Sequence, residues 1–191
     1  MSLPSRRIIW ASVLAFCGLG LFWVLSAFSQ NTTATSGPLT QARVGHTATL
    51  LPSGKVLIAG GSGPAGVLND AELFDPVTLS ATALTNGLTT ARTKYTATLL
   101  PQRETLLIAG QDNLGVLFST EMFNPANQTF QALSPNVQVL RAGHTTTLLL
   151  DGRVLITGGQ SSGALGSAEA FNAQTVFVFK SAYDPAAGSH S

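Results

Sequence analysis

A nine-residue segment that occurs three times constrains the fold of this chain more than any other feature of its sequence. Residues 43–51 (RVGHTATLL) recur as residues 92–100 (RTKYTATLL) and as residues 141–149 (RAGHTTTLL), so that Arg43, Arg92 and Arg141 are 49 residues apart. A sequence period of this length marks one supersecondary unit per repeat, and neighbouring units stack to bury a shared core. The chain is therefore predicted to be a repeat protein.

Each copy continues through two further segments in the same register. An apolar run ends at glycine in all three copies, at Gly60, Gly61, Gly110, Gly158 and Gly159. After a loop, each copy has a Glu-x-Phe segment that begins at Glu72, Glu121 and Glu169. A glycine pair at a strand end lets the backbone pass a point where a Cβ atom would clash. These glycines and glutamates are therefore expected to be structural positions of the repeat.

Every repeat has the pattern of short β-strands joined by turns. Residues 47–51 are rich in Thr and Leu, and the Pro-Ser-Gly of residues 52–54 signals a turn. Residues 56–59 are continuously apolar, as in a strand buried on both faces, whereas residues 72–74 alternate polar with apolar. A fourth strand is weak in the first copy, at residues 80–84, and clearer in the second, at residues 129–133. The fold class is all-β.

The quoted motifs resemble kelch repeats, in particular those of the central domain of galactose-oxidase-like and exported bacterial proteins. The resemblance covers residues 40–172 and implies a partial β-propeller of about three four-stranded blades, within residues 40–88, 89–137 and 138–180. The chain departs from the family in lacking the usual tryptophan of the fourth strand, for which Phe130 is a substitute in the second copy. Residues 181–191 are expected to be a tail, with a possible remnant of a further repeat.

Three blades are fewer than the four to eight that close a propeller, and open sheet edges invite pairing with another chain. Two alternatives follow. The chain is a truncated fragment of a longer propeller, or copies associate as a homo-oligomer that completes a ring.

The N-terminus has the pattern of an export segment. Arg6 and Arg7 precede residues 8–28, which carry no charge and are long enough for a hydrophobic helix that spans a bilayer. Residues 1–29 are predicted to be a signal peptide or an uncleaved signal anchor, followed by a polar linker at residues 30–39. Either alternative exports the repeats, and the membrane is contacted only through residues 8–28 if they are uncleaved. The single cysteine, Cys17, lies within this segment.

The charge balance argues against nucleic acid as a partner. The chain has ten Lys and Arg against nine Asp and Glu, and two of the ten basic residues belong to the export segment. The remaining body has no basic field of the kind that attracts phosphate backbones.

Two sets of side chains recur once per repeat and are candidate ligand-binding groups. The resemblance places His46, Tyr95 and His144 near the mouth of a central channel, with Arg43, Arg92 and Arg141 close by. The functional interpretation is a polar or cationic ring facing a ligand. The structural interpretation, which we favour, is that the recurring His and Tyr side chains are satisfied by neighbouring backbone, because scaffold groups repeat whereas catalytic groups are usually unique. In the same interpretation each recurring Arg makes a bidentate pair with a recurring Glu, because a buried charge needs a partner.

No catalytic motif stands out. Galactose-oxidase-like copper chemistry needs a cysteine-linked tyrosine, and the only cysteine lies in the export segment. We therefore expect no enzyme activity, no cofactor and no metal, and a non-catalytic extracytoplasmic binding or scaffold module that contacts an unknown protein or carbohydrate. Its contacts are predicted on the variable loops at residues 62–69, 111–118 and 160–166. The alternative is an inactive remnant of a larger galactose-oxidase-like or glycan-active propeller enzyme.

Overall fold

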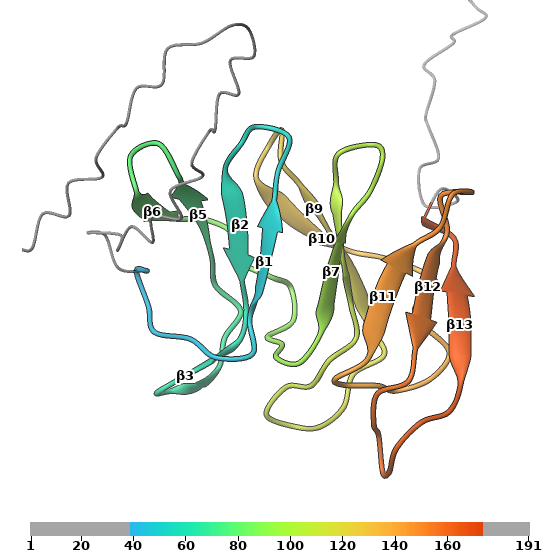
Figure 1. Ribbon diagram of the computed structural model, residues 1–191. Coiled ribbons are helices and arrows are strands. Elements are labelled where there is room, and N and C mark those ends of the chain that lie inside the picture. The colour runs from blue at the N-terminus through green and yellow to red at the C-terminus, as the bar shows by residue number, and fades with distance from the viewer. Residues whose placement is uncertain (1–38, 174–191) are drawn as a thin grey trace, which may run out of the picture. The chain divides into compact units, whose positions relative to one another are not determined.

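A computed structural model describes residues 39–173, and this part of the chain is all-β (Figure 1). It contains 13 strands in four antiparallel sheets and no α-helix within the described residues. The all-β fold class is thereby confirmed. The expected N-terminal helix and linker, and the C-terminal tail, lie outside the described residues.

The three larger sheets correspond to the three repeats. The first contains β1 (Thr47–Leu50), β2 (Val56–Ala59), β5 (Ala71–Asp75) and β6 (Ser80–Ala83), in that spatial order. The second contains β7 (Thr96–Leu99), β8 (Thr105–Ile108), β9 (Thr120–Asn124) and β10 (Thr129–Ala132). The third contains β11 (Thr145–Leu148), β12 (Val154–Thr157) and β13 (Ala168–Phe171). The chain follows the same path through each sheet.

The strand register is the same in all three sheets. Thr47 pairs with Ala59, Thr96 with Ile108 and Thr145 with Thr157, always at the start of the first strand. Residues 49 positions apart along these two strands are therefore structurally equivalent. The fourth strands of the first two repeats begin at the residues predicted from the sequence, Ser80 and Thr129, while the third sheet has three strands within the described residues.

A small two-stranded sheet lies in the loop between β2 and β5. It consists of β3 (Ser62–Gly63) and β4 (Gly66–Val67). The corresponding loops of the second and third repeats have only isolated bridges, Gln111 with Val116 and Gln160 with Ala164. All three segments were expected to be loops.

The core consists of two apolar clusters, each shared by neighbouring sheets. One brings Leu57 and Ala71 of the first sheet together with Leu107 and Phe123 of the second. The other joins the opposite side of the second sheet to the third, through Leu100, Leu106, Ile108, Met122, Val154, Ile156 and Phe171. Because the second sheet contributes to both clusters, its second strand β8 buries Leu106, Leu107 and Ile108 in succession, without polar alternation. The first strands β1, β7 and β11 lie next to one another in series (Figure 1).

The outer strand of the second sheet is anchored by an aromatic contact. The Phe130 ring packs on Phe123 with a centroid separation of 4.8 Å, and it adds to the cluster between the first two sheets. This is the place where the family resemblance led us to expect a tryptophan substitute.

The strand-end glycines occupy left-handed backbone conformations. Gly110 has φ +97°, and a Cβ added there would lie 2.6 Å from the carbonyl oxygen of Thr93. The position before it is glycine in two repeats, but it is Ala109 in the second, with φ 52°. A close backbone approach thus explains why one glycine of the pair is present in every copy.

Candidate functional site

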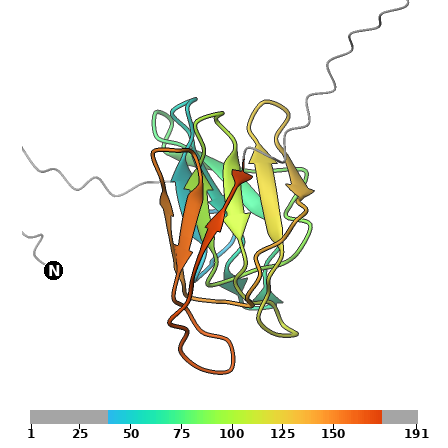
Figure 2. The same cartoon turned by 90° about the vertical axis from the view of Figure 1, so that its right-hand side faces the viewer.

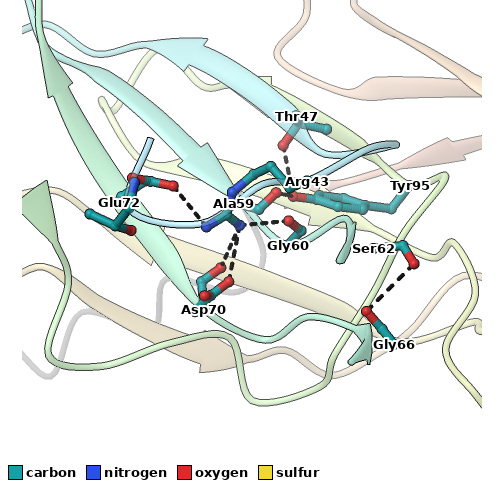
Figure 3. A network of polar contacts seen from close by, with 10 residues as sticks. Arg43, Thr47, Ala59, Gly60, Ser62, Gly66, Asp70, Glu72 and Tyr95 are labelled. Atoms are coloured by element: carbon teal, nitrogen blue, oxygen red, sulfur yellow. Dashed lines mark hydrogen bonds and ion pairs between the residues drawn. The ribbon is translucent and has the colours of Figure 1, made fainter. Parts of the chain in front are cut away.

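The recurring arginine of the first repeat holds two strands of its own sheet together (Figure 3). Arg43 Nη1 donates to the Gly60 carbonyl at 2.7 Å and to Asp70 Oδ1 at 3.0 Å. Its Nη2 donates to Glu72 Oε1 at 2.8 Å, and both side chains of this ion pair have 0% exposure. The guanidinium therefore connects the end of β2 to the beginning of β5.

The same network recurs in the other two repeats. Arg92 Nη2 lies 2.5 Å from Glu121 Oε1, and Arg141 Nη2 lies 2.5 Å from Glu169 Oε1. In these repeats a serine replaces Asp70 as the second side-chain partner, with Ser119 Oγ at 3.1 Å and Ser167 Oγ at 3.2 Å. This second partner was not predicted from the sequence, although it always precedes the glutamate by two residues.

Each recurring glutamate also accepts hydrogen bonds from the segment that leads into its repeat. Glu121 accepts from the backbone N–H groups of Thr89 and Thr90, at 2.7 and 2.9 Å. Glu72 accepts from Thr40 N at 2.7 Å, and Glu169 accepts from Gln138 N at 2.6 Å. Each carboxylate thereby joins its arginine to the incoming backbone.

This arrangement favours the structural interpretation of the arginines. The Arg–Glu pair of each repeat is present, but it is not bidentate, because the second guanidinium nitrogen donates to a backbone carbonyl instead. The side chains of Arg43, Arg92 and Arg141 have 0% exposure. The hypothesis that they form a ligand-facing ring is not supported by this geometry, because an external anion would have to displace an internal carboxylate.

The recurring His and Tyr side chains connect one repeat to the preceding one. Tyr95 donates its hydroxyl hydrogen to the Ala59 carbonyl at 2.6 Å and accepts a hydrogen bond from Thr47 Oγ1 at 2.8 Å (Figure 3). His144 Nε2 is hydrogen-bonded to Thr96 Oγ1 at 2.8 Å. Since Thr96 is the equivalent of Thr47, the two contacts occupy the same place in successive interfaces.

Burial controls the ionisation of these groups. Burial raises the pKa of Tyr95 to about 12, because the phenolate would lose its hydration. Burial, with a smaller contribution from the nearby Arg141 charge, lowers the pKa of His144 to about 4. Both side chains are therefore neutral at physiological pH. A neutral histidine can bind a metal, but the Nε2 atom of His144 is already hydrogen-bonded within the protein.

His46 occupies the same position in the first repeat, without a preceding repeat among the described residues. Its Nδ1 atom is buried and has no hydrogen-bond partner in the described part of the chain, as is also true of Nδ1 of His144. Of the six residues predicted to line a binding face, the structure therefore places three in internal ion pairs and two between repeats. His46 alone lies on the unpaired side of a sheet.

The loops after the second strands form a second candidate surface. They leave the same end of the three sheets (Figures 1 and 2). The first two loops are joined by a hydrogen bond of 3.2 Å from the Val67 N–H to Asn113 Oδ1. Leu114 is 96% exposed next to Asn113, and Phe118 is 49% exposed in the same loop. The sequence predicted contacts on these loops without singling out these residues.

Comparisons with known proteins add no family assignment. No protein-family model matches the chain, and no curated protein matches it. Within residues 39–173, no group of three or more His, Cys, Asp or Glu side chains is placed to hold a metal ion. The same residues include no helix that is long and apolar enough to cross a membrane.

Proposed function

We propose that this chain is an exported kelch-type β-propeller protein of about three blades. In this proposal it acts as a non-catalytic binding module that contacts another protein through the loops after its second strands. The repeated sheets, with their adjacent first strands and their identical register, support the propeller interpretation. The N-terminal sequence supports export, because a basic start precedes an uncharged apolar segment.

The observation that carries the proposed function is the contrast between scaffold and loops. The Arg–Glu pair recurs in all three repeats, and its arginine side chain has 0% exposure in each. The loops differ in sequence from repeat to repeat, yet they emerge together at one end (Figures 1 and 2). A rigid framework that presents variable loops side by side is a common design for binding.

The loop surface has the chemistry of a protein contact. Leu114 and Phe118 are exposed apolar side chains, and they neighbour the small or polar residues Asp112, Asn113 and Gly115. Exposed apolar groups with a polar rim mark protein interaction sites. This composition favours a protein partner over a carbohydrate.

Site-specific photocrosslinking tests the proposed surface. A benzophenone amino acid is placed at Leu114 in the full chain, and the protein is irradiated in its native host. The matched control carries the same group at Leu150, which is fully exposed in the turn at the opposite end of its sheet. We expect a discrete protein adduct from position 114 and none from position 150. The captured protein, once purified, should bind the wild-type chain and lose affinity for the Leu114→Asp variant.

The proposal is overturned by three outcomes. One is equal adducts from both positions, and another is no adduct from position 114. The third is binding of the purified chain to an immobilised glycan that Leu114→Asp abolishes, which would make carbohydrate the partner. Export is tested separately, by fusing residues 1–39 to a reporter enzyme that is active only outside the cytoplasm.

A further inference from the structure

Each sheet has two faces. We call the face on the side of the next repeat the forward face, and the face on the side of the preceding repeat the rear face. At each interface within the chain, the forward face of one sheet packs against the rear face of the next. In the first two sheets the forward faces contain Leu57 and Leu106, whereas the rear faces of the second and third contain Leu107 and Ile156. Residues 39–173 thus contain two examples of the same interface.

Three contacts occur in both interfaces. Gly61 N donates to the carbonyl of Arg92 at 2.8 Å, as Gly110 N does to Arg141 at 2.9 Å. The backbone N–H groups of Arg92 and Arg141 donate to Leu68 and Leu117, each at 3.1 Å. The third contact joins the threonine of a forward face to the Tyr or His of the next rear face. The interface is therefore a defined pattern of contacts.

The forward face of the third sheet has the residues of this interface, but no repeat among residues 39–173 covers it. Ala168 is exposed, although its equivalents Ala71 and Thr120 are only 1% and 0% exposed. Ala170 is also exposed, although its equivalent Met122 is 5% exposed. This face combines exposed alanines with half-buried leucines, at Leu149, Leu155, Ala168 and Ala170.

The polar groups of this face also lack their usual partners. Gly159 N, the equivalent of Gly61 N, has no backbone partner among residues 39–173. Thr145, the equivalent of Thr47 and Thr96, is hydrogen-bonded to Thr157 of its own sheet at 2.8 Å, and not to another repeat. Both groups are in place to receive a rear face.

The rear face of the first sheet is the complementary surface, and among residues 39–173 it is open at the end next to its loop, although Ile58 at its centre is only 7% exposed. Val44 is 70% exposed, whereas its equivalents Thr93 and Ala142 are 6% and 0% exposed. An open hollow of about 370 Å³ is lined by Ala42, Arg43, Val44, Ser62, Gly63 and Pro64. In the second repeat the equivalent Arg92 backbone is covered by Leu68 of the preceding loop. The hollow therefore lies where the loop of a preceding repeat is expected.

We infer that the forward face of the third sheet binds the rear face of the first sheet in a second copy of this chain. Such a contact is head-to-tail, and it reproduces the two interfaces already present within one chain. It places His46 of one copy against Thr145 of the other, Gly159 N against the Arg43 carbonyl, and the Leu165 carbonyl against Arg43 N. The inference is independent of the partner bound by the loops.

Cysteine crosslinking tests the pairing directly. Cys17 is the only cysteine of the chain, so Cys17→Ser gives a background without thiols. One chain carries His46→Cys and a second, differently tagged, carries Thr145→Cys; a short bismaleimide then joins thiols that lie close together. A single chain with Thr96→Cys and His144→Cys is the matched control, because these side chains are in contact across the internal interface. We expect a mixed adduct in clear excess over adducts between identical chains. Predominant adducts between identical chains, or the absence of any adduct, overturn the inference.

Sedimentation of the full chain provides a second test that does not depend on the crosslinker. Wild type should associate, and Ala170→Glu should be monomeric, because a charge on the forward face would be buried without a partner. Gln131→Glu, at an exposed position of β10, is the control that should still associate. A mixture of Ala170→Glu with Val44→Glu should recover dimers, because one intact forward face and one intact rear face remain. A monomeric wild type, or association unaffected by Ala170→Glu, overturns the inference.

Discussion

Removing the carboxylate of Glu121 should destabilise the protein more than any change at an exposed charge. Glu121 has 0% exposure and accepts three hydrogen bonds, from Arg92 Nη2, Thr89 N and Thr90 N. In Glu121→Ala all three donors lose their partner, and the Arg92 charge remains buried. Breaking a buried ion pair from one side costs about 3–5 kcal/mol. This is a large share of the roughly 5–15 kcal/mol by which a domain is stable.

Two other carboxylates give a graded comparison. Glu169 makes the equivalent contacts with Arg141, but its side chain is 16% exposed, so water partly solvates the arginine left behind. Glu169→Ala should therefore destabilise less than Glu121→Ala. Asp151 pairs with Arg153, and both side chains are 50% exposed, so Asp151→Ala should leave the stability almost unchanged.

The assay is urea denaturation of the full chain at pH 7, followed by circular dichroism. If Glu121→Ala does not fold, Glu121→Gln replaces it, with an expected loss of about 1.5–3 kcal/mol because hydrogen bonds to a charged group are lost. If Glu121→Ala lowers the free energy of unfolding by less than about 1 kcal/mol, the Arg92–Glu121 pair does not hold the fold together as argued. An order in which Asp151→Ala costs more than Glu121→Ala would lead to the same conclusion.

Three further predictions follow from the interfaces and turns. Tyr95 should titrate at about pH 12 in spectrophotometric titration of the folded protein. Because folding raises the pKa of Tyr95, its contribution to stability is present below pH 10 and is lost as the pH rises toward 12. The lowered pKa of His144 should make the urea midpoint fall as the pH drops from 6.5 toward 4, and His144→Gln should remove this part of the pH dependence. In thermal melts, Gly110→Ala should lower the stability more than Gly54→Ala. Both glycines have positive φ, so each substitution adds a backbone strain of about 1–2 kcal/mol. Only at Gly110 would the new Cβ also meet neighbouring atoms, at 2.6 Å. Equal losses at the two glycines would contradict the close-approach explanation.

The strands could be predicted from the sequence because their signals are local. The second strand of the first repeat was expected at residues 56–59, and β2 is Val56–Ala59. Its continuous apolar run reflects burial on both faces, which is a property of one segment and its flanking turns. The β3–β4 hairpin was not predicted, because strands of two residues, three of whose four positions are Ser or Gly, carry no periodic signal.

The candidate site could be predicted only where a physical requirement links residues within one repeat. An arginine and a glutamate that recur together indicate a pair, because neither charge is stable alone in a core. The serine partners at Ser119 and Ser167 were missed, since serine is common in loops and carries no such requirement. The exposed Leu114 was missed as well, because a single apolar residue in a loop gives no sign of whether its side chain is covered.

The recurrence of His46, Tyr95 and His144 favoured a structural role, but it did not reveal which surface these side chains contact. Its side chain contacts the preceding repeat, so the identity of the residue depends on a partner that lies 48 residues away along the chain. Tyr95 reaches a backbone carbonyl as well as a threonine, whereas the histidine ring of His144 is bonded to the threonine alone. His46 has the same place without a preceding repeat among the described residues. At the two interfaces within residues 39–173, the equivalent side chains, Tyr95 and His144, contact a threonine of the preceding repeat. The same kind of contact, made by His46 with another repeat, therefore explains this position better than a small ligand does.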